Sequence, residues 1–503
     1  MSTRQSDSFD LLEATVADVH AAIEAGVTTV EALVDAYLAR IDAYDDELNA
    51  ILTLNDDALA RARELDAHYN REGFIGPLHG VPVILKDNMD THDMPTSAGS
   101  VVLAESVPAR DAFVVARLRD AGVVVIAKAN LQELSFGVDT ISSLGGATKN
   151  PYALDRRPAG SSGGTAAAIA ANLGLLGTGT DTCSSIRSPP AFNGLVGVRP
   201  TRGLVSRTGI VPLSETQDTA GPITRTVEDA ARMLEVMAGF DAEDPVTARG
   251  ARGAPTDGYV THLTDDGLDG ARIGVARQFF GVQDTAHAEN ATDAEAVTAV
   301  LDDAIEALST MGATIVDPVD VVDVDRLLSA RVIGDEFARD FDAYLATLEE
   351  PPVSSLAALV DTGTIAPAVE SRLLDTNVLD VDSGSLSENR GYLRRLHRRA
   401  HLHDRTLSTL TAYDLDAICY PPSTVPPVRI PDHQPFSAMN CELSAHTGLP
   451  AIVVPAGHTD DGLPVGLELL SGPFEERRLL ELAYAYEQAT GHRVPPDGFQ
   501  PLD

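Results

Sequence analysis

Cysteine and long apolar runs are both scarce in this sequence. It has three cysteines, Cys183, Cys419 and Cys441, an odd number without a C-x-x-C pair. That count argues against a disulfide framework and against a zinc knuckle, and it suits a reducing cytoplasm. No uncharged apolar run reaches the roughly 18 residues that indicate a membrane span, and the N-terminus lacks the apolar segment of a secretory signal. The sequence therefore predicts a cytoplasmic protein without a membrane partner.

Lysine is scarce as well, and acidic residues are in large excess. Lys86, Lys128 and Lys149 are the only lysines, and the formal net charge is −38. Such a charge repels polyanions, which excludes nucleic acid as a partner. It is typical of proteins that work in very high salt, where the Debye length falls to about 3 Å at 1 M. The alternative is an acidic, arginine-biased cytoplasmic protein, and neither interpretation identifies the chemistry.

Short β-branched runs alternate with helical segments along the chain, which predicts an α/β fold with helices on both faces of a sheet. A turn at 460–462 separates two apolar runs as in a hairpin, so the sheet is expected to be mixed. The strand-like runs are 81–85, 123–126, 175–178, 195–198 and 451–454, and the helical segments are 112–121, 165–173 and 226–237.

A small-residue stretch, Gly160-Ser161-Ser162-Gly163-Gly164, directly precedes an alanine-rich helix. It satisfies G-x-S-x-G, the nucleophile elbow of α/β-hydrolases, with Ser162 in the middle. That motif requires a buried strand immediately before it. Here Pro151 and Pro158 flank a charged segment, which predicts a loop and rejects the elbow.

A second stretch, residues 179–191, follows the strand-like run 175–178 and contains Ser185. Small residues at a strand end allow backbone N–H groups to converge on one point, as an oxyanion hole requires. Taken alone, either stretch could equally be a turn without a catalytic role.

Further fragments occur in order along the chain. Together with the two serine-bearing stretches they resemble the amidase-signature family over about residues 10–490. The additional fragments are Gly80-Val81-Pro82, Lys86-Asp87-Asn88, Asn130 with Glu133 and Gly137, Thr148-Lys149-Asn150-Pro151, Asp218-Thr219-Ala220-Gly221-Pro222, Gly448-Leu449-Pro450 and Val453-Val454-Pro455.

The resemblance implies a Ser-Ser-Lys triad that forms an acyl-enzyme, with Ser185 as nucleophile, Ser161 as bridging serine and Lys86 as base. It also implies a non-proline cis peptide bond next to Ser161. The oxyanion would be received by backbone N–H groups of the loop, and neighbouring residues would brace that loop. The expected oxyanion donors are Thr182, Cys183, Ser184 and Ser185, and the expected bracing residues are Asp181, Arg187 and Ser162.

The choice of lysine as base has its own physical logic. A serine hydroxyl needs an adjacent base, and a lysine can serve only when burial lowers its pKa from about 10.4. Arginine does not deprotonate in proteins. Lys128 follows an apolar run much as Lys86 does, and periodicity does not separate them, so the family pattern selects Lys86.

The sequence departs from the family pattern at three positions. Cys183 and Ser184 stand where the loop usually has two glycines, and a positive φ there would strain a non-glycine residue by about 1 kcal/mol or more. Ala159 replaces a glycine often found before Gly160, which looks like the milder change.

We expect one amidase-signature domain over 1–503, built of N-terminal helices (1–75), a signature core (76–240), a mostly helical variable region (241–410) and the C-terminal part of the core (411–503). The expected activity is hydrolysis of a small carboxylic amide to ammonia or an amine. A homodimer would be unsurprising.

Two alternatives stay open. One is the glutamine-hydrolysing amidase subunit of a tRNA-dependent amidotransferase, which would require a partner subunit; the other is a non-catalytic binding protein on the same scaffold. No metal or organic cofactor is implied, because the histidines of 397–403 lie among arginines and indicate a solvated helix face.

Overall fold

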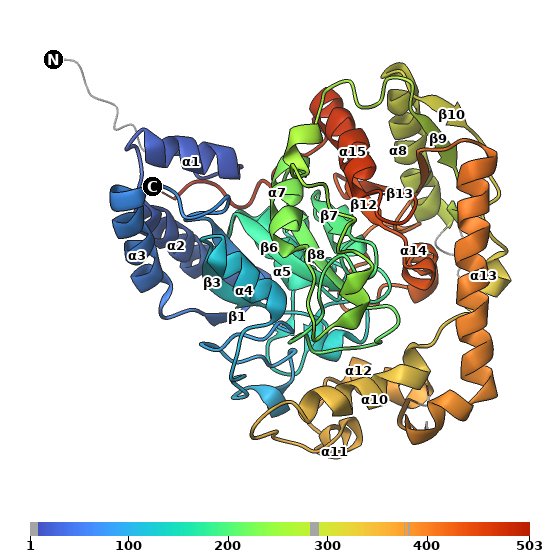
Figure 1. Ribbon diagram of the computed structural model, residues 1–503, viewed down its shortest axis with the longest axis horizontal. Helices are drawn as coiled ribbons and strands as arrows, with labels where there is room; N and C mark the ends of the chain where they lie inside the picture. The colour runs from blue at the N-terminus through green and yellow to red at the C-terminus, as the bar shows by residue number, and fades with distance from the viewer. Residues whose placement is uncertain (1–8, 282–290, 377, 381–382, 503) are drawn as a thin grey trace.

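A single mixed sheet of eleven strands runs through the molecule (Figure 1). The structure is a computed structural model that describes residues 9–281, 291–376, 378–380 and 383–502; part of the N-terminal segment used to judge targeting lies outside them. In spatial order the sheet strands are β1 (Ile51–Leu54), β3 (Val124–Ala129), β2 (Pro82–Lys86), β6 (Leu176–Asp181), β8 (Thr219–Thr224), β7 (Val196–Arg199), β12 (Ala451–His458), β13 (Pro464–Leu470), β11 (Ala417–Tyr420), β9 (Arg272–Val275) and β10 (Thr314–Val316).

Both strand directions occur in this sheet. Strand β2 is parallel to β3 and β6, whereas β6–β8, β8–β7, β7–β12 and β12–β13 are antiparallel. The predicted hairpin corresponds to β12 and β13, joined through the turn at 460–462. A small separate hairpin is formed by β4 (Ile141–Ser142) and β5 (Gly146–Ala147). The predicted mixed α/β sheet is confirmed.

Helices cover the sheet on both faces. Helices α4, α7 and α15 contact one another or neighbouring strands, and α5 and α6 contact the sheet and each other. The helices are α1 (Val16–Glu24), α2 (Val30–Leu48), α3 (Ala58–Glu72), α4 (Phe113–Asp120), α5 (Gly163–Ala170), α6 (Ser188–Phe192), α7 (Val227–Met237), α8 (Ala291–Thr310), α9 (Val324–Leu328), α10 (Ile333–Leu345), α11 (Leu356–Val360), α12 (Pro367–Asp375), α13 (Arg390–Ala412), α14 (Glu442–Thr447) and α15 (Glu476–Thr490).

Figure 1 places the N-terminal helices α1–α3, in blue, at one end of the molecule, while α10–α12, in gold, lie along a second side and α13 along a third. Among the described residues, no helix combines the length and apolarity needed to cross a membrane.

The ends of β2 and β6 position the residues that the sequence singles out. Parallel neighbours end at the same edge of a sheet, so Lys86, at the end of β2, lies beside the loop that follows β6 at Asp181. Helix α5 packs closely on β6 because Gly177 has no side chain: a Cβ there would lie 2.4 Å from Thr165 Cγ2. This close packing brings the residues just before α5, including Ser161, to the same edge.

Candidate active site

Lys86 is buried where β2 ends, among hydroxyl groups. Its Nζ lies 2.6 Å from Ser161 Oγ and 2.7 Å from Thr180 Oγ1, and the side chain is fully buried. Burial lowers the pKa of Lys86 to about 7, although the charges of Asp181 and Asp218 act in the opposite direction. The amine is therefore neutral for a large fraction of the time near pH 7.

Ser161 contacts both of its expected partners. The Gly160–Ser161 peptide bond is cis, and the Ser161 backbone N–H donates to Ser185 Oγ over 2.8 Å. Since its own hydroxyl bonds Lys86, Ser161 links the lysine to Ser185. The structure thus brings together the three residues that the sequence identified.

The loop after β6 is held by bonds that leave its N–H groups free. Thr182 Oγ1 donates to Asp218 Oδ1 over 2.5 Å, and Gln217 Nε2 donates to the Thr182 carbonyl over 2.8 Å. Within the described residues, the backbone N–H groups of 183–185 have no acceptor. They are therefore available to a ligand oxygen.

A buried charge network braces this loop. Arg187 Nε lies 3.1 Å from Asp181 Oδ2, Arg199 Nη1 lies 2.8 Å from Asp181 Oδ1, and Arg187 Nη1 lies 2.7 Å from Glu468 Oε1. Burial alone would raise the pKa of Asp181, but the two arginines hold it below its ordinary value. Ser162 belongs to a different contact, since its Oγ lies 3.4 Å from the Thr180 carbonyl.

The cysteines depart from expectation. Cys183 and Cys441 form a disulfide across 258 residues of sequence, and Cys419 is free and buried. The expectation of no disulfide was therefore wrong, because an odd count does not exclude one pair and the fold alone brings distant cysteines together. The bond also removes the cysteine argument for a reducing compartment. It ties the loop that carries Ser185 to the segment that begins α14.

The departures from the family pattern fall differently than expected. Neither Cys183 nor Ser184 has a positive φ, so neither replaced glycine creates backbone strain. Ala159, expected to be the milder change, has a φ of 62°. That left-handed conformation favours glycine, so the strained position is Ala159.

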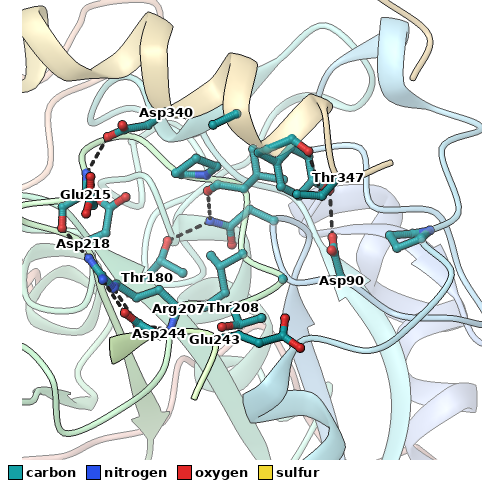
Figure 2. A pocket seen from close by; sticks show the side chains of 18 of the residues that line it. Asp90, Thr180, Arg207, Thr208, Glu215, Asp218, Glu243, Asp244, Asp340 and Thr347 are labelled. Carbon is teal, nitrogen blue, oxygen red and sulfur yellow. Dashed lines mark hydrogen bonds and ion pairs between the residues drawn. The ribbon is translucent and has the colours of Figure 1, made fainter. Parts of the chain in front are cut away.

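A cavity of about 550 Å³ lies beside this site (Figure 2). Thr180, which bonds Lys86, and Thr182, from the loop, both line it. Figure 2 shows Asp90 on one side of the cavity and Arg207, Asp218 and Asp244 on the other. The cavity therefore adjoins the lysine through Thr180 and the loop through Thr182.

Two groups of potential metal ligands occur among the described residues, and neither resembles a built site. One combines the two disulfide-bonded cysteines with Glu442, so its sulfurs are not thiolates. The other, His92 with Asp93 and Asp111, is exposed, and Arg119 pairs with both of its carboxylates.

Comparison with known proteins decides the family. The family described as Amidase matches residues 32–480, which is most of the chain. The chain belongs to the amidase-signature family. A probable amidase of Arabidopsis thaliana is 34% identical, covering 98% of this chain and 93% of that protein. A glutamyl-tRNA(Gln) amidotransferase subunit of Pseudomonas aeruginosa is 35% identical, covering 90% of this chain and 92% of that protein.

A solved structure shows the same architecture. The native peptide amidase of Stenotrophomonas maltophilia superimposes with a TM-score of 0.87 at 36% identity, covering 97% of this chain and 99% of that chain. An amidase-signature enzyme of the class that cleaves amides is therefore established at the level of family and fold, and its substrate is a separate question.

Sequence reasoning about this amidase missed four contacts. Thr180 as a partner of Lys86 could have been suspected, because it lies inside a matching fragment. Arg199, Glu468 and Cys441 carry no local signal, since each reaches the site from a strand or helix far away in the sequence.

Proposed function

We propose that this amidase hydrolyses the C–N bond of a linear carboxylic amide through Lys86, Ser161 and Ser185. The observation that carries the proposal is the continuous contact from Lys86 Nζ through Ser161 to Ser185 Oγ, at 2.6 Å and 2.8 Å. A serine nucleophile with a neutral amine two groups away matches the logic of an activated nucleophile.

In the proposed cycle, Ser185 Oγ attacks the amide carbonyl carbon and forms a C–O bond. Its proton passes to Ser161 Oγ while the Ser161 proton passes to Lys86 Nζ. When the C–N bond breaks, the same path returns a proton to the leaving nitrogen. Water then cleaves the acyl-enzyme ester and restores the Ser185 hydroxyl.

The negative oxygen of the tetrahedral intermediate would be stabilised by the loop. Support comes from the unpaired backbone N–H groups of 183–185 and from the disulfide and ion pairs that fix this loop. Thr182 is the fourth expected donor. Preorganised donors of this kind contribute about 10²–10³-fold each.

A stand-alone amidase is favoured over an amidotransferase subunit. The support is the near-complete overlap with a peptide amidase in both sequence coverage and fold. Relatives named as amidotransferase subunits are similarly identical, so the alternative predicts glutamine hydrolysis only with a partner subunit. The net charge of −38 also makes direct contact with tRNA unfavourable.

The test measures ammonia or amine release from aliphatic, aryl and peptide C-terminal amides in molar KCl. Ser185→Ala should lose at least about 10³-fold in kcat/KM. Ser184→Ala is the matched control, because it deletes a neighbouring hydroxyl and keeps the backbone N–H. Activity that survives Ser185→Ala would show that the nucleophile is misassigned. Folded protein that cleaves only glutamine, and only with a second subunit, would favour the amidotransferase.

A further inference from the structure

The inner wall of the cavity in Figure 2 carries buried acceptors without donors. Asn88 is 1% exposed, and its Nδ2 donates to Thr180 Oγ1 over 3.0 Å and to the Val211 carbonyl over 3.4 Å. These bonds fix the orientation of the amide, and Asn88 Oδ1 is left without a partner among the described residues. Thr219 Oγ1 and Ser135 Oγ, on the same wall, are unpaired too. Such a wall favours a ligand that donates hydrogen bonds.

Asp90 adds a carboxylate that has no counter-ion. It is 5% exposed and accepts one hydrogen bond from the Tyr344 hydroxyl at 2.8 Å. In the described part of the chain, no basic side chain lies within ion-pair distance of it. Burial raises the pKa of Asp90 to about 7, against the opposing effects of Tyr344 and the more distant Lys128. Buried carboxylates are normally paired, so a cation is the missing element.

The two arginines of the cavity do not supply that cation. Arg110 Nη1 lies 2.8 Å from Glu243 Oε1, and Arg207 Nε lies 2.9 Å from Asp244 Oδ2, so each is neutralised by its own carboxylate. Asp218, across the cavity from Asp90 in Figure 2, accepts only from a hydroxyl and two backbone N–H groups. The uncompensated charge of the cavity is therefore negative.

We propose that this cavity binds a protonated amine, with Asp90 as its counter-ion and Asn88 Oδ1 as a second acceptor. An ammonium group offers three donors and no acceptor, which complements these groups. Ile210, Val211 and Leu213 provide an apolar wall for an attached alkyl chain, and a volume of about 550 Å³ suits a small organic ligand.

The amine has two sources compatible with the position of the cavity. Thr180 Oγ1 bonds both Lys86 and Asn88, so the cavity adjoins the proposed triad. The ammonium is either a basic group of the amide substrate or the amine released on cleavage. The inference deepens the proposed function and rests on it for this link to turnover, but binding itself does not require catalysis.

Binding is tested by calorimetric titration of the full chain with n-butylammonium chloride at pH 8. Wild type should bind the ammonium and not the uncharged n-butanol, and Asp90→Asn should weaken binding at least tenfold. Tyr344→Phe, which keeps the carboxylate, should retain binding, and thermal melts establish that each variant is folded. Asp56→Asn removes an exposed acid and controls for net charge. Equal affinity of wild type and Asp90→Asn, or equal binding of n-butanol, would overturn the proposal.

Kinetics then separate the two sources. If the substrate carries the cation, Asp90→Asn lowers kcat/KM for lysinamide at least tenfold and leaves its uncharged analogue norleucinamide unchanged. If the cavity receives the product, both amides are cleaved as before, and product inhibition by the released amine weakens at least tenfold. An active Asp90→Asn enzyme with neither change would overturn the link to turnover. Ammonium binding by a chain that cleaves no amide would count against the proposed function alone.

Discussion

Lys86 and Lys128 are buried in neighbouring parallel strands, and only Lys128 has a carboxylate partner. Leu85 is opposite Lys128 in the β2–β3 pairing, so the two lysines are one register position apart. Lys128 Nζ lies 3.1 Å from Asp87 Oδ1, whereas Lys86 Nζ contacts the hydroxyls of Ser161 and Thr180. The fold therefore distinguishes two lysines that the local sequence pattern leaves equivalent.

The two lysines should respond differently to the same substitution. Lys86→Met should lower kcat/KM by at least about 100-fold, because it removes the proposed base, with the chain still folded. Lys128→Met leaves the buried Asp87 carboxylate without its cation, which should lower the free energy of unfolding by about 3–5 kcal/mol. Amide turnover and denaturant unfolding of both variants check this. A Lys86→Met enzyme with full activity would contradict the assignment of the base.

Activity should depend on pH through Lys86. Burial lowers the pKa of Lys86 to about 7, and the proposed base acts only when neutral, so its active fraction grows as pH rises through 7. We expect kcat/KM for an uncharged amide to increase nearly tenfold per pH unit below 7 and to level off above it. An unperturbed lysine would give that rise only near its ordinary pKa of about 10.4. A profile measured from pH 5.5 to 9 distinguishes the two cases, and a flat profile below 7 would contradict the prediction.

Local pattern was sufficient for the framework of this site. The apolar runs ending near Lys86 and Thr178 correspond to β2 and β6, and the loop predicted before Gly160 is present. These features depend on neighbouring residues, because burial of a short strand is encoded in its own side chains. The ordered family fragments then selected Ser161 and Ser185, which the structure places in contact.

Long-range relationships could not be derived in that way. The cavity is assembled from segments near 88–110, 207–219, 243–245 and 340–349, and no periodicity relates them. Arg399 is a second example: it belongs to the basic segment predicted to be a solvated helix face, but it is buried and donates to the Thr216 and Ala445 carbonyls. Its charge is used inside the fold, which only tertiary contacts reveal.

The disulfide should stabilise the fold and the loop before Ser185. Cys183→Ser should lower the free energy of unfolding by about 2–4 kcal/mol, mainly because the unfolded chain loses a cross-link over 258 residues. Amide turnover should fall as well, since Cys183 lies two residues before Ser185. Denaturant unfolding with and without dithiothreitol measures the effect. Cys419→Ala, at the free cysteine, should keep the response to reductant, and a response that vanished there would contradict the pairing.

Ala159 provides a test of backbone strain that is independent of catalysis. Its φ of 62° lies in the left-handed region, where a Cβ costs about 1–2 kcal/mol. Glycine also loses more freedom on folding than alanine, which offsets part of the gain. Ala159→Gly should therefore raise the free energy of unfolding by up to about 1 kcal/mol.

Ala39→Gly is the matched control, because Ala39 is exposed within α2 and the same substitution there should lower stability by about 1 kcal/mol. Opposite signs for the two variants in denaturant unfolding would attribute the gain to φ at 159. A loss at both positions would show that the surroundings of Ala159 hold its methyl group favourably enough to outweigh the strain.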